Sequence, residues 1–273
     1  MTDRASEQPI LQRATGKARI SFKYNQSRTC LDDLYQQGSA KVKFPRQAHC
    51  EAVLINTTGG LTDGDEFATE LHWQKGTSAL VTTQAAERIY KSRSAPASIN
   101  TTLTVAANAR ACWFPQETIL FNGSRLVRAT QVELQASARL FAIESLVFGR
   151  TAMNETVTSG GIEDRWRVHS EGRLIYADNF RLEGNLQAQL NRPGIGSGAI
   201  ATSTALLVGY DPGTADAVRQ QIELNKDVSG GISDLGALLV VRLLADNGSA
   251  LRKAVMELFK TVESPDLPRV WLC

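Results

Sequence analysis

The sequence predicts a mainly β fold of stacked antiparallel or mixed β-sheets, followed by a small βαβα C-terminal part that contains two helices. Apolar and polar residues alternate with a period of two over much of residues 18–190, which is typical of half-buried strands. Helical spacing of apolar residues appears only beyond residue 198. The chain has 273 residues, 42% of them hydrophobic and 21% charged, which is enough for a sizeable core in a globular protein.

The alternation is clearest in three stretches. Over residues 132–140 the even positions are apolar and the odd positions are polar. Residues 99–105 and 180–190 follow a similar pattern, and Gly184 interrupts the latter, where a bulge or bend is expected. Turn-forming Gly, Asn and Asp residues separate such stretches. Successive strands without helical segments between them predict stacked sheets.

The pattern changes after the loop at 191–198. Residues 204–210 and 237–244 are mostly apolar runs that predict buried strands, and Thr214 between them is expected to cap a short helix. A last helix is predicted with Ser249 as its N-cap and a stop at residues 264–265. Its apolar stripe consists of Leu251, Val255, Leu258, Phe259 and Val262.

We interpret the chain as a single domain with a short tail, although its length would also allow two domains. Residues 1–17 are expected to form a flexible N-terminal tail, and residues 18–273 one β-rich domain. Within this domain the β body covers about 18–198 and the α/β tail about 199–273. The α/β tail is expected to pack on the β body.

Charge and cysteine usage exclude several classes of function. The 30 basic and 28 acidic residues give a net charge of +2, which argues against nucleic acid or an anionic membrane surface as a partner. No window approaches the roughly 20 apolar residues of a membrane span, and the polar start has no signal-peptide core. The four cysteines are scattered, so no disulfide framework or zinc knuckle is expected. We therefore expect a cytoplasmic protein.

The chain carries no recognisable catalytic motif. A phosphate-binding P-loop and a G-x-S-x-G nucleophile elbow are both missing from the sequence. The glycine-rich stretch 194–199 matches a dinucleotide pattern, but no strand is expected before it and no helix after it. The most distinctive segments, 54–65 and 80–92, hold neither a nucleophile beside a base nor a metal-ligand spacing. Their composition favours turns and buried polar contacts.

Four carboxylates stand out by their sequence surroundings. Asp63 and Asp65 flank a glycine and would face the same way in an extended chain. Glu117 and Glu144 are each surrounded by large apolar residues. Such a carboxylate either pairs with a cation such as a neighbouring arginine, or lines a wet cavity. The sequence leaves both possibilities open.

Five segments form an ordered set along the chain. They are LINTTGGLTDGD at 54–65, TTQAAERIYKS at 82–92, WFPQETILF at 113–121, FGRTAMNE at 148–155 and LPRVWLC at 267–273. Together they closely resemble the urease accessory protein UreD (UreH) family, over about residues 18–271. The matching residues are Gly59, Gly60, Gly64, Asp65, Thr82, Thr83, Gln84, Tyr90, Pro115, Gln116, Gly149, Arg150 and Glu155. The family often has Gly at the position of Asn154. Asn can take the same place if it adopts a left-handed backbone conformation, which Asn tolerates.

The resemblance implies a β-rich fold of stacked sheets with few helices, and a subunit without catalytic activity. Proteins of this family act as scaffolds in urease maturation. They bind apo-urease on one side and the accessory protein UreF on the other, and the GTPase UreG docks through UreF. Nickel is thought to pass through an internal tunnel to the urease active site. The resemblance thus implies no tightly bound cofactor and only transient nickel.

The side-chain chemistry agrees with transit rather than storage of a metal. Carboxylate, carbonyl and water ligands release Ni²⁺ readily, whereas a cage of Cys and His would trap it. The chain has three histidines and no thiolate cluster. We hypothesise that several of five acids line the nickel path, namely Asp63, Asp65, Glu117, Glu144 and Glu155.

Two functions of other classes stay open at this point. A hydrolase that uses paired carboxylates, Asp65 with a second acid, would need a closed pocket with the two carboxylates about 5–10 Å apart. A plain β-rich interaction module would instead expose large apolar patches and contain no channel.

Overall fold

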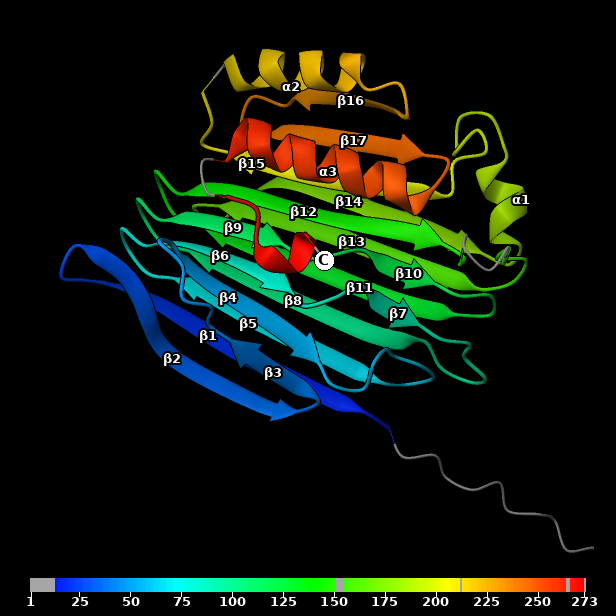
Figure 1. The fold of residues 1–273 in the computed structure, drawn as a ribbon, viewed down its shortest axis with the longest axis horizontal. Helices are drawn as coiled ribbons and strands as arrows, with labels where there is room; N and C mark the ends of the chain where they lie inside the picture. The colour runs from blue at the N-terminus through cyan, green and yellow to red at the C-terminus, as the bar shows by residue number, and fades with distance from the viewer. Residues whose placement is uncertain (1–12, 151–154, 212, 264–265, 273) are drawn as a thin grey trace, which may run out of the picture.

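Two β-sheets stack face to face in the computed structural model, which describes residues 13–150, 155–211, 213–263 and 266–272 (Figure 1). The mainly β prediction is confirmed. One sheet has seven strands in the order β14 (Arg173–Glu183), β13 (Gly161–Ser170), β11 (Arg125–Leu134), β8 (Ala97–Val105), β5 (Glu66–Trp73), β1 (Thr15–Asn25) and β2 (Arg28–Gly38). β1 therefore already begins inside the segment expected as a tail, and residues 1–12 lie outside the described residues.

The second sheet has ten strands. Eight follow the order β16 (Val228–Asp234), β17 (Leu239–Ala245), β15 (Ala201–Val208), β12 (Arg139–Phe148), β9 (Arg110–Phe114), β6 (Ser78–Thr83), β4 (Cys50–Asn56) and β3 (Ala40–Lys43). The remaining two are β10 (Thr118–Leu120), which pairs with β12, and β7 (Glu87–Ile89), which pairs with β10. The strands of the C-terminal part thus extend this sheet through β15.

Successive strands of the body alternate between the two sheets. β5, β8, β11 and β13 belong to the seven-stranded sheet, whereas β4, β6, β9 and β12 belong to the other. Because the chain reverses direction each time it crosses, strands that become neighbours within one sheet run parallel. Antiparallel pairs occur toward the edges, for example β1 with β2 and β13 with β14. The sheets are mixed, and the antiparallel alternative of the sequence prediction fails in their centre.

Two hydrophobic cores lie on opposite faces of the ten-stranded sheet. The first fills the space between the sheets and includes Trp73, Trp166 and Phe148. The second lies between the outer face of this sheet and α3 (Gly248–Val262), and includes Phe114 and Phe259. β12 is buried on both faces for this reason. α2 (Gly213–Leu224) packs against α3 and β16 (Figure 1).

The segment 180–190 is not the single bulged strand that its alternation predicts. β14 ends at Glu183, Gly184 follows with φ +89°, and a short helix, α1 (Leu186–Leu190), begins after it. Asn185 caps α1 by accepting the N–H of Ala188. A left-handed glycine ends the strand and redirects the chain, so the structure has a third helix among its described residues.

The C-terminal part differs from its prediction in three details. Gly213 already belongs to α2, so Thr214 lies inside the first turn rather than at the cap. Asn247, not Ser249, caps α3, because its side chain accepts the N–H of Ala250. β16 was not predicted, since its residues are mostly small and polar. The predicted apolar stripe of α3 is buried, and the predicted stop at 264–265 lies outside the described residues.

Within the described part of the chain, no helix is long and apolar enough to cross a membrane. The short 3-10 helix η2 (Arg269–Trp271) completes the fold and packs on the second core through Trp271.

The cap of α3 can be tested with a matched pair of variants. Replacing the cap, Asn247→Ala, is expected to lower the free energy of unfolding by about 1 kcal/mol, because one first-turn N–H loses its acceptor. Ser249→Ala, at the position that the sequence favoured, is expected to change it by less than about 0.5 kcal/mol. Urea denaturation measures both, and equal losses would contradict Asn247 as the cap.

Candidate functional site

The first two motif segments form one structural unit. The N–H of Leu61 donates to the Arg88 carbonyl, and the N–H of Tyr90 donates to the Leu61 carbonyl, each at 2.7 Å. Gly60, with φ +147°, lies so close that a Cβ there would stand 2.5 Å from the Tyr90 ring. Gly60 is therefore needed for the loop at 57–64 to pack on β7.

Asp63 and Asp65 close this loop. Asp63 accepts the N–H groups of Ala95 and Ser94 at 2.6 and 2.9 Å. These bonds lower the pKa of Asp63 to about 2. Asp65 accepts the N–H groups of Ala14 and Thr62 at 2.7 and 2.9 Å. Both buried carboxylates thus bind backbone, and neither lines the two hollows described below.

Other motif residues hold the C-terminal segment against the second core. Trp271 Nε1 donates to Thr82 Oγ1 at 3.0 Å, and its ring stacks on Phe114 with centroids 4.1 Å apart. Gln116 Nε2 donates to the carbonyls of Gln84 and Val270 at 2.9 and 3.0 Å. The backbone N–H of Gln116 also donates to Thr83 Oγ1 at 2.9 Å, and the buried Pro115 precedes it.

Arg252 of α3 joins these groups. Its Nη1 donates to Gln116 Oε1 at 3.0 Å and to Glu117 Oε2 at 2.9 Å, and its Nη2 donates to the Trp271 carbonyl at 3.2 Å. The guanidinium carbon lies 4.6 Å from the centroid of the Trp271 ring. Glu117, which is 6% exposed, is therefore an ion-paired carboxylate.

Glu117 also lines an open hollow on the outer face of the ten-stranded sheet, which we call the outer pocket. It measures about 800 Å³. Its wall comes from β7, β10, β12 and the first turn of α3. The residues that define it are Arg88, Tyr90, Glu117, Ile119, Phe121, Val147, Gly149, Arg150, Asn247, Gly248, Ser249 and Arg252. Seven of them belong to the motif segments 82–92, 113–121 and 148–155, so these segments meet here.

Glu155 stands beside the outer pocket rather than in its wall. Its two carboxylate oxygens accept from Arg150 Nε and Nη2, each at 2.9 Å, and these bonds lower the pKa of Glu155. Gly149, with φ +88°, allows the turn, because a Cβ there would lie 2.5 Å from the Glu155 carbonyl oxygen. Asn154 lies outside the described residues.

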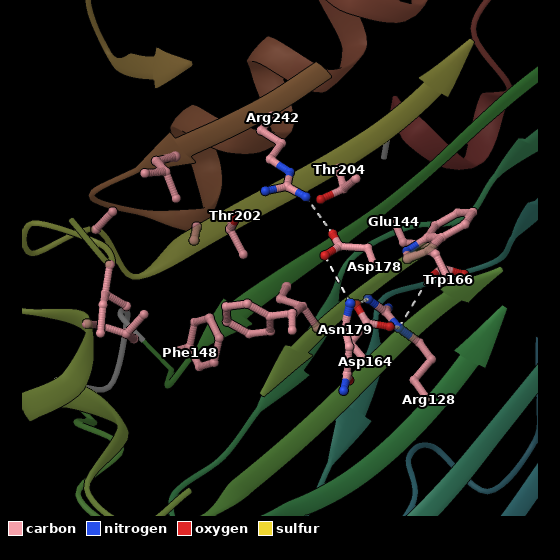
Figure 2. Close-up of a pocket in the computed structure, with 17 residues that line it drawn as sticks. Arg128, Glu144, Phe148, Asp164, Trp166, Asp178, Asn179, Thr202, Thr204 and Arg242 are labelled. Atoms are coloured by element: carbon pink, nitrogen blue, oxygen red, sulfur yellow. Dashed lines mark hydrogen bonds and ion pairs between the residues drawn. The ribbon is translucent and has the colours of Figure 1, made fainter. Parts of the chain in front are cut away.

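A second hollow, the inner cavity, lies between the two sheets and measures about 360 Å³ (Figure 2). β11 to β15 and β17 supply most of its wall. Its charged and amide side chains are Arg128, Glu144, Asp164, Asp178, Asn179 and Arg242. They range from fully buried at Glu144 to exposed at Arg242, so the cavity opens toward solvent on the side of Arg242.

Glu144 and Arg128 form the buried end of this cavity. Arg128 donates through Nε and Nη2 to Asp164 at 2.9 and 2.6 Å. Trp113 Nε1 and Thr130 Oγ1 donate to Glu144 Oε1. Glu144 Oε2 lies 3.1 Å from Arg128 Nε but has no hydrogen bond among the described residues. Burial raises the pKa of Glu144, and the charge of Arg128 opposes the rise.

At the open end, Asp178 is tied to three neighbours. Arg242 Nη2 donates to Asp178 Oδ2 at 2.6 Å, and the Tyr176 hydroxyl donates to the same oxygen at 3.1 Å. The N–H of Asn179 donates to Asp178 Oδ1 at 2.9 Å. Figure 2 shows Asp178 between Arg242 on one side and the Arg128 group on the other.

The five acids of the sequence hypothesis are therefore dispersed. Asp63 and Asp65 lie in the loop, Glu117 and Glu155 at the outer pocket, and Glu144 in the inner cavity. Over the residues that the structure describes, no group of three or more His, Cys, Asp or Glu side chains could hold a metal ion.

Sequence reasoning missed Arg128, Asp164 and Arg252. The sequence did hold a signal for Arg128. Arg128 is at an even-numbered position of its strand, like the buried Leu126 and Val132, so it points to the same side and a charge must be buried there. Asp164 has the same position between Ile162 and Trp166 on β13. No local pattern identified Arg252, whose partners lie far away in sequence.

Comparisons with known proteins give a consistent result. Residues 14–272 match the family model described as UreD urease accessory protein. The chain is 40% identical over 272 residues to "Urease accessory protein UreD" of Brucella suis, covering 96% of this chain and 95% of that protein. It is 40% identical over 264 residues to the protein of that name from Rhizobium leguminosarum bv. trifolii, covering 95% and 96%. It is 37% identical over 270 residues to the protein of that name from Agrobacterium fabrum, covering 97% of this chain and 94% of that protein.

Removing the arginine of α3 tests its structural role. Arg252→Met is expected to lower the free energy of unfolding by about 2–4 kcal/mol, because it leaves Glu117 buried without its cation. Adding Glu117→Gln to that variant is expected to restore part of the loss. Lys253→Met, at the exposed neighbouring position, serves as the control with an effect below about 0.5 kcal/mol. Additive losses in the double variant would contradict the ion pair.

The raised pKa of Glu87 predicts that the free energy of unfolding depends on pH. Burial raises its pKa to about 7, although the amide of Asn56 donates to both carboxylate oxygens. The folded state therefore holds this proton more tightly than the unfolded state, and stability is lost as the pH rises from about 4.5 to 7. Glu87→Gln is expected to gain on the order of 1–3 kcal/mol relative to wild type between pH 4.5 and 8. A pH-independent difference in chemical denaturation would contradict this.

Proposed function

Because the chain belongs to the UreD urease accessory protein family, we propose that it is a non-catalytic scaffold of urease maturation. It binds apo-urease and the complex of UreF with the GTPase UreG, in the cytoplasm. It helps to deliver nickel to the urease active site along an internal route and holds no cofactor tightly. The interaction-module alternative is included in this role, but it accounts for neither the inner cavity nor the buried charges in it.

The observation that carries the nickel part of the proposal is the inner cavity. Three carboxylates, Glu144, Asp164 and Asp178, line it together with two arginines, Arg128 and Arg242, so one negative charge is in excess when all are ionised. Neither Cys nor His lines it. Oxygen ligands without thiolate or imidazole hold Ni²⁺ weakly and exchange it readily, as transit requires.

Glu144 is the acid of the original five best suited to this route. Its Oε2 lies 3.1 Å from Arg128 Nε but accepts no hydrogen bond among the described residues, and burial raises the pKa of this carboxyl. A divalent cation in transit would compete with Arg128 for this oxygen. The other four acids are tied to backbone N–H groups or arginines.

The paired-carboxylate hydrolase receives less support. Asp65, the acid first considered for it, accepts the N–H groups of Ala14 and Thr62 through its two oxygens. Of the acids in the inner cavity, Glu144 and Asp164 are both contacted by Arg128. An acid and a base bridged by one permanent cation cannot readily exchange a proton with a substrate.

The partner assignment is tested by co-purification of the tagged chain with UreF, UreG and apo-urease, and by urease activation in cells that lack the chain. We expect one complex and restored urease activity. Failure to associate, together with unimpaired urease in the deleted cells, would contradict the proposal.

The nickel route is tested in the same cells with Glu144→Gln, which keeps the size of the side chain and removes its charge. We expect the variant to assemble the complex but to yield urease with several-fold less nickel and activity. Asp216→Asn, with a side chain 81% exposed on α2, is the control. Normal nickel content with Glu144→Gln would remove Glu144 from the route, and thermal unfolding checks that the variant is folded.

A further inference from the structure

The outer pocket is the larger of the two hollows, and the nickel route does not use it. It opens on the outer face of the ten-stranded sheet, where β7 and β10 lie beside the N-terminal end of α3 (Figure 1). A hollow of about 800 Å³ accommodates several residues of an extended peptide. Motif residues from three distant segments build it, so its shape depends on long-range packing of the fold.

The floor of the outer pocket is apolar. Ile119, Phe121 and Val147 form it, and Tyr90 packs edge-on against Phe121 with ring centroids 5.1 Å apart. Tyr90 is nevertheless 40% exposed. An exposed aromatic ring fixed over an apolar floor favours an occupant with an aromatic or aliphatic side chain.

The rim is basic. Arg88, Arg150 and Arg252 line the pocket, and Glu117 and Glu155 neutralise the last two. Arg88 is exposed and forms no salt bridge among the described residues, although burial raises the pKa of the neighbouring Glu87 carboxyl and the charge of Arg88 partly opposes that rise. The pocket therefore keeps one unpaired guanidinium, which favours a carboxylate in the occupant.

The start of α3 adds donors to this guanidinium. Gly248 and Ser249 line the pocket, and the first N–H groups of a helix have no partner within it. The Asn247 side chain accepts the N–H of Ala250, so it does not use the N–H groups of Gly248 and Ser249. The positive end of the helix dipole thus lies beside Arg88 and strengthens the preference for negative charge.

We propose that the outer pocket binds a segment of a partner protein in which acidic side chains adjoin an aromatic or aliphatic one. The apolar side chain packs against Tyr90 and Ile119, and a carboxylate pairs with Arg88 and the free N–H groups of α3. This inference rests on the proposed function, because the partners of the scaffold supply the segment.

Charge reversal tests the electrostatic part in the complex with UreF, UreG and apo-urease. Arg88→Glu is expected to weaken the binding of one partner at least about tenfold, and Arg88→Gln to weaken it less. Arg173→Glu, an equal charge change at an exposed position of the other sheet, is the control. Thermal unfolding verifies that the variants fold. Equal binding by Arg88→Glu and the wild type, or equal weakening by Arg88→Glu and Arg173→Glu, would overturn the proposal.

Photo-crosslinking identifies the occupant. Tyr90 is replaced by p-benzoylphenylalanine, the assembled complex is irradiated, and the linked peptide is identified by mass spectrometry. We expect a peptide of one partner with acidic residues next to an apolar one. A linked peptide without acids, or an assembled complex without a link, would overturn the inference and leave the proposed function intact. If no complex assembles with the wild-type chain, the proposed function itself fails.

Discussion

The contact of Arg252 with Gln116, Glu117 and the carbonyl of Trp271 is the interaction on which the outer half of the structure depends. α3 and the C-terminal segment are both amphipathic pieces that could not remain folded alone. One guanidinium, with donors in a fixed plane, binds both of them to Gln116 and Glu117, which connect β9 to β10. Its own ring contact with Trp271 shields these bonds from water, which keeps them strong.

The sequence was informative about burial and much less informative about partners. The apolar stripe of α3 reported correctly which side chains face a core, because burial leaves a local periodic pattern. The alternation over 132–140 was correct for Val132, Leu134, Ala138 and Leu140, but it crosses the turn between β11 and β12, where Ala136 is exposed. The same alternation appears in parallel and antiparallel strands, so it could not give the strand order. The role of Gly184 was mispredicted because a left-handed glycine can either end a strand or bend it. β16 was missed because its small and polar residues resemble a turn.

The candidate site was predictable in composition but not in arrangement. Glu117 and Glu144 were recognised as carboxylates in apolar surroundings, and both are indeed buried. Their cations, Arg252 and Arg128, could not be assigned, because the first pair is separated by 135 residues and the second arginine lies on the other sheet. Asp63 and Asp65 were grouped with them by residue type alone, whereas their oxygens accept backbone N–H groups, some from their own loop and some from distant segments.

The crossing of successive strands between the two sheets has a kinetic consequence. The parallel neighbours at the centre of each sheet are separated in sequence by a strand of the other sheet, so the centre of neither sheet can form from a continuous piece of chain. Formation of such non-local pairs must precede most of the stabilising burial, and chains of this kind fold slowly. The walls of the inner cavity come from both sheets, and its acidic lining therefore comes together only when the sandwich closes. A nascent or partly unfolded chain then presents separate carboxylates, and the lining of the inner cavity is complete only in molecules that have finished folding.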